Sequence, residues 1–315
     1  MTNPSKVDVV GVGLNATDTL IPVAHYPSRG SKVEFRSAKV LPGGQVATAM
    51  IACQQWGLRS RYIGKVGDDI AAELHRSEFA RLGVEAHLFT APGCPSQQAF
   101  ILVDDGGERT VLWKRDDRLK LRPQELQRDW IVHSRALHVD GHDTAAASTA
   151  AGWARDAGVP VIADLDELYP GVEKLLQSVD YLITSRDIPG RLTEEPDLRK
   201  SLPALHQRFG SRLTAATLGE EGVLAWDGKQ FHYAAAFCIQ TMDTTGAGDI
   251  FHAGFIYGLL QGWSLQRQLD FACAAAALNC TAIGARGGIQ PVDSIEHVIA
   301  NGARHAQAYE SSSLT

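Results

Sequence analysis

The chain alternates short apolar runs, rich in β-branched residues, with longer stretches of helical periodicity over most of its length. Such alternation is typical of a largely parallel sheet with helices on both faces. The runs that predict buried strands are Val7–Gly13, Ser60–Val66, Ala136–Asp140, Pro160–Asp164, Tyr181–Thr184 and Leu213–Leu218. The helical stretches are Val46–Trp56, Ile70–Leu82, Thr144–Ala157, Leu168–Gln177 and Leu198–Phe209. We therefore expect an α/β fold around one central, mostly parallel sheet.

The pattern changes after residue 220, where Val223–Trp226 and Phe231–Ala236 flank Asp227-Gly228 and predict a hairpin. Helices are expected at about 247–262, 264–282 and 293–308. Residues 16–40 and 97–115 carry strand-like alternation instead, for example in Lys32–Arg36, and predict a small β-sheet that covers a site as a lid. No linker separates these parts, so residues 1–315 are expected to form a single domain with that lid.

Composition narrows the class of protein. The chain has 315 residues, 44% of them hydrophobic, which is enough for a large core. Its formal net charge of −6 argues against nucleic acid or an anionic membrane surface as partner. No apolar stretch approaches the ~20 residues of a membrane span and no signal peptide is visible, so a cytoplasmic location is expected. The five cysteines form no C-x-x-C pair, which indicates reduced thiols and no structural zinc site.

The run Asp-Thr-Thr-Gly-Ala-Gly-Asp at residues 243–249 leads directly into an apolar helix. Amide groups at a helix N-terminus attract an anion, so an acidic residue in the same turn needs a reason. Asp249 has one if it takes a proton from a hydroxyl group while the amides hold the phosphoryl group under attack. The simpler alternative is an acidic residue that complements the helix dipole. The run is not a Walker A loop, because no Gly-Lys-Ser/Thr follows it.

Two further glycine turns are candidates for ligand contact. Gly43 and Gly44 precede a helix and either form a tight turn or let a polyol approach the backbone, with Gln45 and Thr48 bonding its hydroxyl groups. Asp18 is a third candidate contact on that side, or the cap of a turn.

Thr217–Gly222 follows a buried strand and is either a plain strand-to-hairpin turn or the floor of a nucleotide site. In the second case Gly219 and Gly222 keep side chains away from the nucleotide.

Other polar motifs carry weaker signals. Gly11–Ala16 matches the loose dinucleotide-binding fingerprint, but the required helix does not follow, so we reject a nicotinamide site. His142 falls at the end of a predicted strand, where open α/β sheets place ligands. The remaining histidines have no such position. Arg109 is either a solvated charge on the lid or a phosphate partner on lid closure.

With these motifs assembled, the chain resembles the ribokinase-like (PfkB) family of carbohydrate kinases over nearly its full length. Asp243–Asp249 is similar to the C-terminal signature of that family. Gly43-Gly44 with the following helix resembles the N-terminal signature, and Tyr62–Asp69 resembles the segment after it.

The resemblance implies a ribokinase-like fold, ATP with Mg²⁺ as the phosphoryl donor system, and transfer to a sugar hydroxyl group. It implies Asp249 as the general base and the amides of Gly246, Ala247 and Gly248 as an anion hole. The positions that match sugar contacts are Asp18, Gly43 and Gly44. Those that match the nucleotide side are Thr217, Gly219, Gly222, the Asn279 of Leu278–Cys280 and, by likeness of Glu108–Val111 to ketohexokinases, Arg109. Gly284–Gly288 resembles a loop that helps hold a monovalent cation such as K⁺ in some members.

The chain departs from the family pattern at three places. Thr48 stands where the family usually has asparagine, and Gln45 replaces an asparagine or glycine. The N-x-x-E motif that organises Mg²⁺ in many members is replaced by Ser185–Ile188, so the metal ligands stay undetermined, with Asp187 or water as candidates.

The substrate is the least constrained prediction. The pattern is nearest to kinases of 6-deoxy-6-sulfofructose and to ketohexokinases, and Lys32 matches a lid lysine of the sulfosugar enzymes. Trp113 and Gly141 occupy other anion-contacting positions of those enzymes, which argues against a sulfonated substrate. We expect a kinase for a ketose or ketose derivative, neither the sugar nor its hydroxyl group being identified, and a homodimer formed through the lid. The alternative is a catalytically silent sugar- or nucleotide-binding regulator on the same fold.

Overall fold

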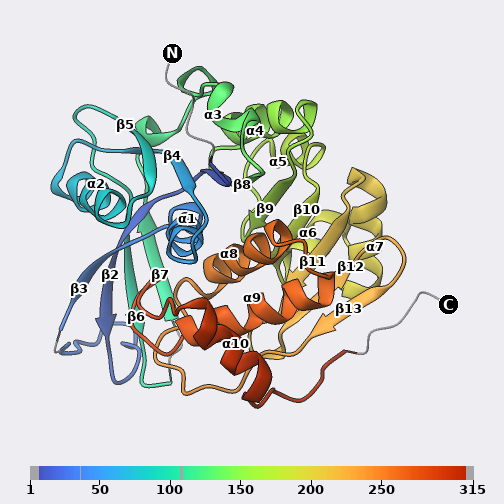
Figure 1. Cartoon of the computed structure of the whole chain (residues 1–315). Helices are drawn as coiled ribbons and strands as arrows, with labels where there is room; N and C mark the ends of the chain where they lie inside the picture. Colours follow the sequence, from blue (N-terminus) through green and yellow to red (C-terminus); the bar gives the residue numbers. More distant parts are fainter. Residues whose placement is uncertain (1–6, 36, 107–108, 310–315) are drawn as a thin grey trace.

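The computed structural model describes residues 7–35, 37–106 and 109–309, and these form two sheets flanked by helices (Figure 1). The strands are Val9–Val12 (β1), Ala16–Pro22 (β2), Lys39–Gly43 (β3), Ser60–Val66 (β4), Glu85–Thr90 (β5), Gln98–Val103 (β6), Arg109–Lys114 (β7), Ala136–Asp140 (β8), Val161–Leu165 (β9), Tyr181–Ser185 (β10), Leu213–Thr217 (β11), Val223–Trp226 (β12) and Phe231–Ala234 (β13). The helices are Gln45–Gln55 (α1), Ile70–Leu82 (α2), Asp129–Val132 (α3), Thr144–Asp156 (α4), Val172–Leu176 (α5), Ile188–Thr193 (α6), Leu198–Phe209 (α7), Ala247–Leu260 (α8), Leu265–Asn279 (α9) and Val292–Asn301 (α10).

The main sheet has the strand order β13-β12-β11-β10-β9-β8-β1-β4-β5. All neighbours from β11 to β5 pair in parallel, whereas β12 and β13 form the antiparallel hairpin predicted around Asp227-Gly228. The expected α/β architecture is therefore confirmed. Successive β1 residues point to opposite sides: Val9 joins the core under α1, α8 and α9, and Val10 joins the core under α4 and α5.

The second sheet has the order β3-β2-β6-β7, with β2 and β6 parallel and both outer strands antiparallel to their neighbours. Figure 1 shows it as a separate group of blue to teal strands beside the main sheet. Its existence was predicted, but one of its strands was assigned to the wrong residues. Residues 32–35 lie in an exposed connection and β3 begins at Lys39, while Arg36 is outside the described residues.

Two helices are shorter than the periodicity suggested. The helix expected over Leu168–Gln177 covers only Val172–Leu176, because Pro170 and Gly171 precede it and Gly171 has a left-handed φ of 87°. The last helix ends at Asn301, before Gly302, instead of continuing to residue 308. By contrast, Ile70–Leu82 is a helix over the predicted span.

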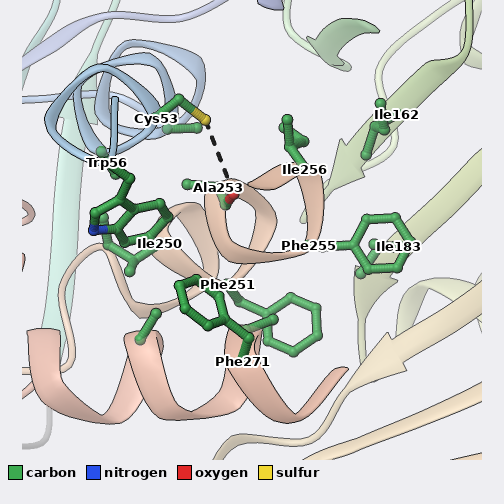
Figure 2. Close-up of a cluster of buried hydrophobic side chains, with 14 of the residues drawn as sticks. Cys53, Trp56, Ile162, Ile183, Ile250, Phe251, Ala253, Phe255, Ile256 and Phe271 are labelled. Carbon is green, nitrogen blue, oxygen red and sulfur yellow. Dashed lines mark hydrogen bonds between the residues drawn. The ribbon is translucent and has the colours of Figure 1, made fainter. Parts of the chain in front are cut away.

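Residues 250–256 of α8 are all buried, which explains why the sequence of this helix is apolar on almost every side. Gly254 allows close approach to α9, since a Cβ atom there would lie 2.8 Å from the Ala272 Cα atom. Figure 2 shows Phe251, Phe255 and Ile256 of α8 pointing to different neighbours, among them Phe271 and the strand residue Ile183. The helix that carries residues 247–249 is thus held from all sides.

Other expectations concern chemistry of the chain as a whole. All five cysteines are free thiols, as predicted. Among the described residues there is no group of His, Cys, Asp or Glu side chains arranged to hold a metal ion. In the same residues, no helix has the length and apolar character needed to cross a membrane.

The packing of α8 predicts that truncation of a buried side chain, Phe255, destabilises the protein much more than truncation of an exposed one, Ile70. Phe255 is fully buried and Ile70 is 90% exposed. We expect Phe255→Ala to lower the free energy of unfolding by about 3–5 kcal/mol, because it leaves a cavity in the core. Ile70→Ala, the matched control, should change it by less than about 0.5 kcal/mol. Urea unfolding of both variants measures this, and equal effects would contradict the packing described.

Candidate functional site

The site lies at the carboxyl ends of the parallel strands. In the main sheet, β1 pairs with β4 on one side and with β8 on the other, so the order of the strands reverses at β1. Such a switch in strand order opens a crevice at the carboxyl edge. Polar side chains follow the strands there: Asp140 ends β8, Asp164 lies in the end of β9, and Ser185 and Thr217 end β10 and β11.

Two cavities meet at this edge. The first, which we call the lid cavity, has a volume of about 440 Å³ and lies between the strand ends and the small sheet. Its lining includes Asp18, Gln97, Arg109, Trp113, Gln45, His142, Asp164, Asp166, Tyr169 and Asp249. The second, the α9 cavity, has a volume of about 720 Å³ and is lined by residues 217–222, by Phe237 and Ile239, and by the α8 and α9 residues Phe251, Cys273, Ala276, Ala277 and Cys280. Thr217 and Gly248 border both cavities.

The turn before α8 is fixed by one carboxylate. The two oxygens of Asp243 accept hydrogen bonds from the backbone N–H groups of Thr245 (2.9 Å) and Gly284 (2.8 Å). Gly246 caps α8 with a φ of 77°, and a Cβ atom there would lie 2.3 Å from the Ala285 carbonyl oxygen. The Ala247 N–H group donates to the Thr244 carbonyl oxygen (3.2 Å). The first N–H groups of a helix have no partner within the helix, so the turn presents the amide of Gly248 at the junction of the cavities.

Asp249 lies in the first turn of α8 and faces the lid cavity. Burial raises the pKa of its carboxyl group to about 6, although the nearby guanidinium groups of Arg109 and Arg286 and a hydrogen bond from Thr48 favour the charged form. The group is therefore mostly ionised at pH 7 and still basic enough to accept a proton.

The space that side chains at Gly43 and Gly44 would need is already filled by neighbouring protein atoms. A Cβ atom at Gly43 would lie 2.0 Å from the Asp18 Oδ2 atom, and one at Gly44 would lie 2.4 Å from the Asn15 Cα atom. Gly44 also has a φ of 96°, which disfavours other residues. The turn thus places the Asp18 carboxyl group in the wall of the lid cavity.

Arg286 joins the Gly43-Gly44 turn to the turn before α8, and sequence reasoning gave it no role. Its buried guanidinium group forms an ion pair with Glu78, donates to the Thr48 hydroxyl oxygen (3.0 Å) and donates to the Gly43 carbonyl oxygen (2.8 Å). Thr48 is fully buried, so it lies behind the cavity wall and contacts Asp249 from there.

Most of the predicted positions border the two cavities. Asp18, Gly44, Gln45, His142, Gly246, Gly248 and Asp249 line the lid cavity, and Thr217, Gly219, Gly222, Ala247 and Gly248 line the α9 cavity. Arg109, predicted on the nucleotide side, lines the lid cavity.

Four predicted residues line neither cavity: Gly43 and Thr48, described above, and Lys32 and Asn279. Lys32 is exposed and lines neither cavity. Asn279 is fully buried, and its amide group donates to the carbonyl oxygens of Thr245 (3.3 Å) and Ala285 (3.0 Å), so it supports the turn before α8 from behind.

Asp166, Gln97 and Tyr169 line the lid cavity and were missed. Asp166 follows a predicted strand by two residues, so the strand-end argument that selected His142 would have found it. Gln97 and Tyr169 carry no local signal. The structure agrees with the rejection of a nicotinamide site at Gly11–Ala16, because the chain passes from β1 into strand β2 with no helix between them.

Burial of the Asp18 carboxyl group predicts a pH-dependent cost to stability. Burial raises its pKa from 3.8 to about 7, so the folded state holds a proton that the unfolded state releases between these values. Stability therefore falls as the pH rises from about 4 to about 7. We expect Asp18→Asn to raise the free energy of unfolding by about 1–2 kcal/mol near pH 8 and to bring no gain near pH 4. Urea unfolding at both pH values tests this, with the surface variant Asp156→Asn as control. A gain of equal size at both would contradict it.

Comparison with known proteins places this site in a family. The chain is 26% identical to a 5-dehydro-2-deoxygluconokinase of Geobacillus thermodenitrificans over 82% of its own length and 83% of the relative's. It is 29% identical to the fructoselysine 6-kinase of Escherichia coli over 76% of its length and 91% of that protein. A solved structure from Agrobacterium tumefaciens, provisionally assigned as a ribokinase, superimposes with a TM-score of 0.86 at 27% identity, covering 94% of this chain and 98% of that one.

The pfkB family carbohydrate kinase model matches residues 8–291, which include both glycine turns, the strand ends and the turn before α8. The relatives named above are phosphotransferases that act on a hydroxyl group of a sugar or sugar derivative. The chain therefore belongs to the pfkB family and is a carbohydrate kinase with a ribokinase-like fold.

Proposed function

We propose that the protein transfers the γ-phosphoryl group of ATP to a hydroxyl group of a ketose or ketose derivative bound in the lid cavity. One observation carries this proposal. The two cavities meet at Gly248, and the carboxyl group of the next residue, Asp249, faces the lid cavity. A donor in the α9 cavity and an acceptor in the lid cavity would thus meet at one helix N-terminus. Fructoselysine, in the name of one relative, is itself a ketose derivative.

The α9 cavity suits the nucleotide. Gly219 has open space at its Cβ position, so the turn after β11 leaves room for a flat ring system, and Ala276 and Ala277 of α9 offer small apolar contacts. The phosphates would extend from there to the amides of Gly246, Ala247 and Gly248, where the helix dipole favours negative charge.

In the proposed reaction Asp249 accepts the proton of the attacking hydroxyl group, and the three amides stabilise charge on the transferred phosphoryl group. Asp18 and Gln45 orient the acceptor, and Arg109 reaches in from the lid. Closure of the lid over the acceptor excludes water that would otherwise hydrolyse ATP.

The donor system in this proposal is ATP with Mg²⁺. Mg²⁺ usually keeps several waters and is held by one or two carboxylates together with substrate phosphates. The carboxyl group of Asp164, which lines the lid cavity as Asp249 does, would hold the ion together with water, whereas Asp187 pairs with Arg191 (3.1 Å). When bound, Mg²⁺ neutralises charge on the phosphates during transfer. The proposal also includes a monovalent cation at Gly284–Gly288.

We further propose that the chain works as one unit in the cytoplasm, with segments 16–40 and 97–115 as its lid, and that two chains pair through their lids. Apolar side chains on the lid support the pairing: Val40 is 59% exposed, Phe100 48% and Leu112 62%. A patch of that kind suits a protein interface. Nucleic acid and membranes are not partners in this proposal.

The first test is removal of the proposed base. We expect Asp249→Asn to lower kcat by about 10³-fold or more, since a positioned general base and its charge are both lost. ATP affinity, measured by calorimetry, should stay within about threefold, because the amide cradle is unchanged. ADP release with Mg²⁺ and a panel of sugars reports the activity, and Asp156→Asn is the surface control. Near-normal turnover in the Asp249 variant would contradict the mechanism.

The second test separates the two cavities. A methyl group at Gly43 collides with the Asp18 carboxyl group, so we expect Gly43→Ala to raise the KM for the sugar by about tenfold or more while the KM for ATP stays unchanged. Gly152→Ala, in α4, is the matched control, because a Cβ atom there meets nothing within 4 Å. An equal rise in both KM values would show that the turn does not belong to the acceptor side.

A further inference from the structure

We infer that the acceptor sugar carries a protonated amine, which Asp166 binds beside an aromatic wall of Trp113, His142 and Tyr169, and that anionic sugars are rejected. This inference rests on the proposed function of the lid cavity as the acceptor site. It adds the chemical class of the acceptor, which neither the family nor the differing substrates of its relatives determines.

The charge lining the lid cavity is strongly one-sided. Five carboxyl groups line it: Asp18, Asp164, Asp166, Glu167 and Asp249. Within the described part of the chain, Arg109 is the one Lys or Arg side chain in that lining. Burial and the charge of Arg115 lower the pKa of His142 to about 3, so this ring is neutral. Burial keeps Asp18 and Asp164 partly or wholly neutral, so the like charge that a phosphate, sulfonate or carboxylate on the sugar would face comes from the other three carboxyl groups.

The hydrogen-bonding balance points the same way. Gln97 is 5% exposed and lines the cavity, and its Oε1 atom has no partner within the described structure. The buried Oε1 atom of Gln45 is likewise unpartnered, while its amide group hydrogen-bonds with the carboxyl groups of Asp164 and Asp166. Both oxygen atoms are enclosed by protein, so the acceptors that a ligand in the cavity meets are mainly the carboxyl groups of the lining. An ammonium group has three donors and no acceptor, whereas an anionic group has only acceptors.

Asp166 is the carboxyl group best placed for an amine. Glu167 forms an ion pair with Arg191, Asp164 is enclosed 3.4 Å from the His252 ring, and Asp249 is reserved for the transferred proton. The Asp166 side chain is open to the cavity and has no ion pair among the residues described. It can therefore bind a cation without first breaking an internal pair.

Aromatic rings complete the cation site. The His142 ring lies 4.5 Å from Tyr169 and 6.1 Å from Trp113, measured between ring centroids, and all three line the lid cavity. The Tyr169 hydroxyl group and the His142 Nε2 atom are 3.0 Å apart, which fixes both rings. The faces of aromatic rings attract ammonium groups, and Trp does so best. Trp113 lies on the lid strand β7, so closure would add it to the site.

The test compares binding of matched sugars by calorimetry without nucleotide. Each set holds an amino sugar, its neutral parent and its N-acetyl derivative: glucosamine with glucose and N-acetylglucosamine, and 1-amino-1-deoxyfructose with fructose and its N-acetyl form. Gluconate and fructose 6-phosphate are the anionic probes. We expect at least one amino sugar to bind about tenfold or more tightly than its parent, acetylation to abolish the gain, and the anions to bind more weakly than any neutral sugar.

Variants locate the effect. Asp166→Asn should remove the gain of the amino sugar while leaving the neutral parent within about threefold, and Trp113→Ala should reduce it in part. Asp156→Asn, which changes a surface carboxylate, should preserve it. The inference is overturned if neutral or anionic sugars bind as well as the amino sugar. It is also overturned if Asp166→Asn weakens all sugars equally or raises the Mg²⁺ requirement equally with every acceptor. Selective amine binding without any ADP release would support this inference and contradict the proposed function instead.

Discussion

The buried guanidinium group of Arg286 connects parts of the site that are far apart in the chain. It contacts Glu78 of α2, Thr48 of α1 and the Gly43 carbonyl group at the end of the lid strand β3, while its own loop packs against Gly246. A buried cation is tolerated because it is paired and every contact is a hydrogen-bond acceptor. Its charge also favours the ionised forms of Asp18 and Asp249. Arg286 therefore links the two glycine turns and, together with Arg109, favours the charged forms of two site carboxyl groups.

Burial of carboxyl groups around the lid cavity lowers the stability of the fold when these groups are charged. Burial raises the pKa of Asp18 to about 7 and raises that of Asp164 well above its usual range. These groups are held in an environment that disfavours their charge because the backbone around them is fixed elsewhere: by Asp243 in the turn before α8, and by α8 itself inside the apolar core of Figure 2. Rigid surroundings keep the carboxyl groups directed into a space that a ligand can fill.

Much of the fold could be predicted where local signals agree. Ile70–Leu82 and Leu198–Phe209 were predicted to the residue, because each has an aspartate cap at its start and a glycine in the left-handed conformation at its end. Lys32–Arg36 was wrongly predicted to be a strand, because alternation of apolar and polar residues does not reveal whether a segment pairs with another strand. In the site, the turn before α8 was recognised because its chemistry is contiguous in sequence. Arg286 could not be recognised in this way, because its hydrogen-bond partners are far away in the sequence. Gln97 could not be recognised either, because it lines a cavity that only the folded chain creates.

A single residue, Gly44, joins strand β3 of the small sheet to helix α1 of the main body. Strand β3 ends at Gly43, Gly44 caps the helix, and α1 begins at Gln45. Asp18, Arg109 and Trp113 belong to the small sheet, whereas Asp166 and His142 remain on the main body. The small sheet and the main body thus share the lining of the lid cavity, and the chain joins them after β1, β3, β5 and β7. A substitution in the small sheet can therefore reshape one wall of the cavity without changing the turn that carries Asp249.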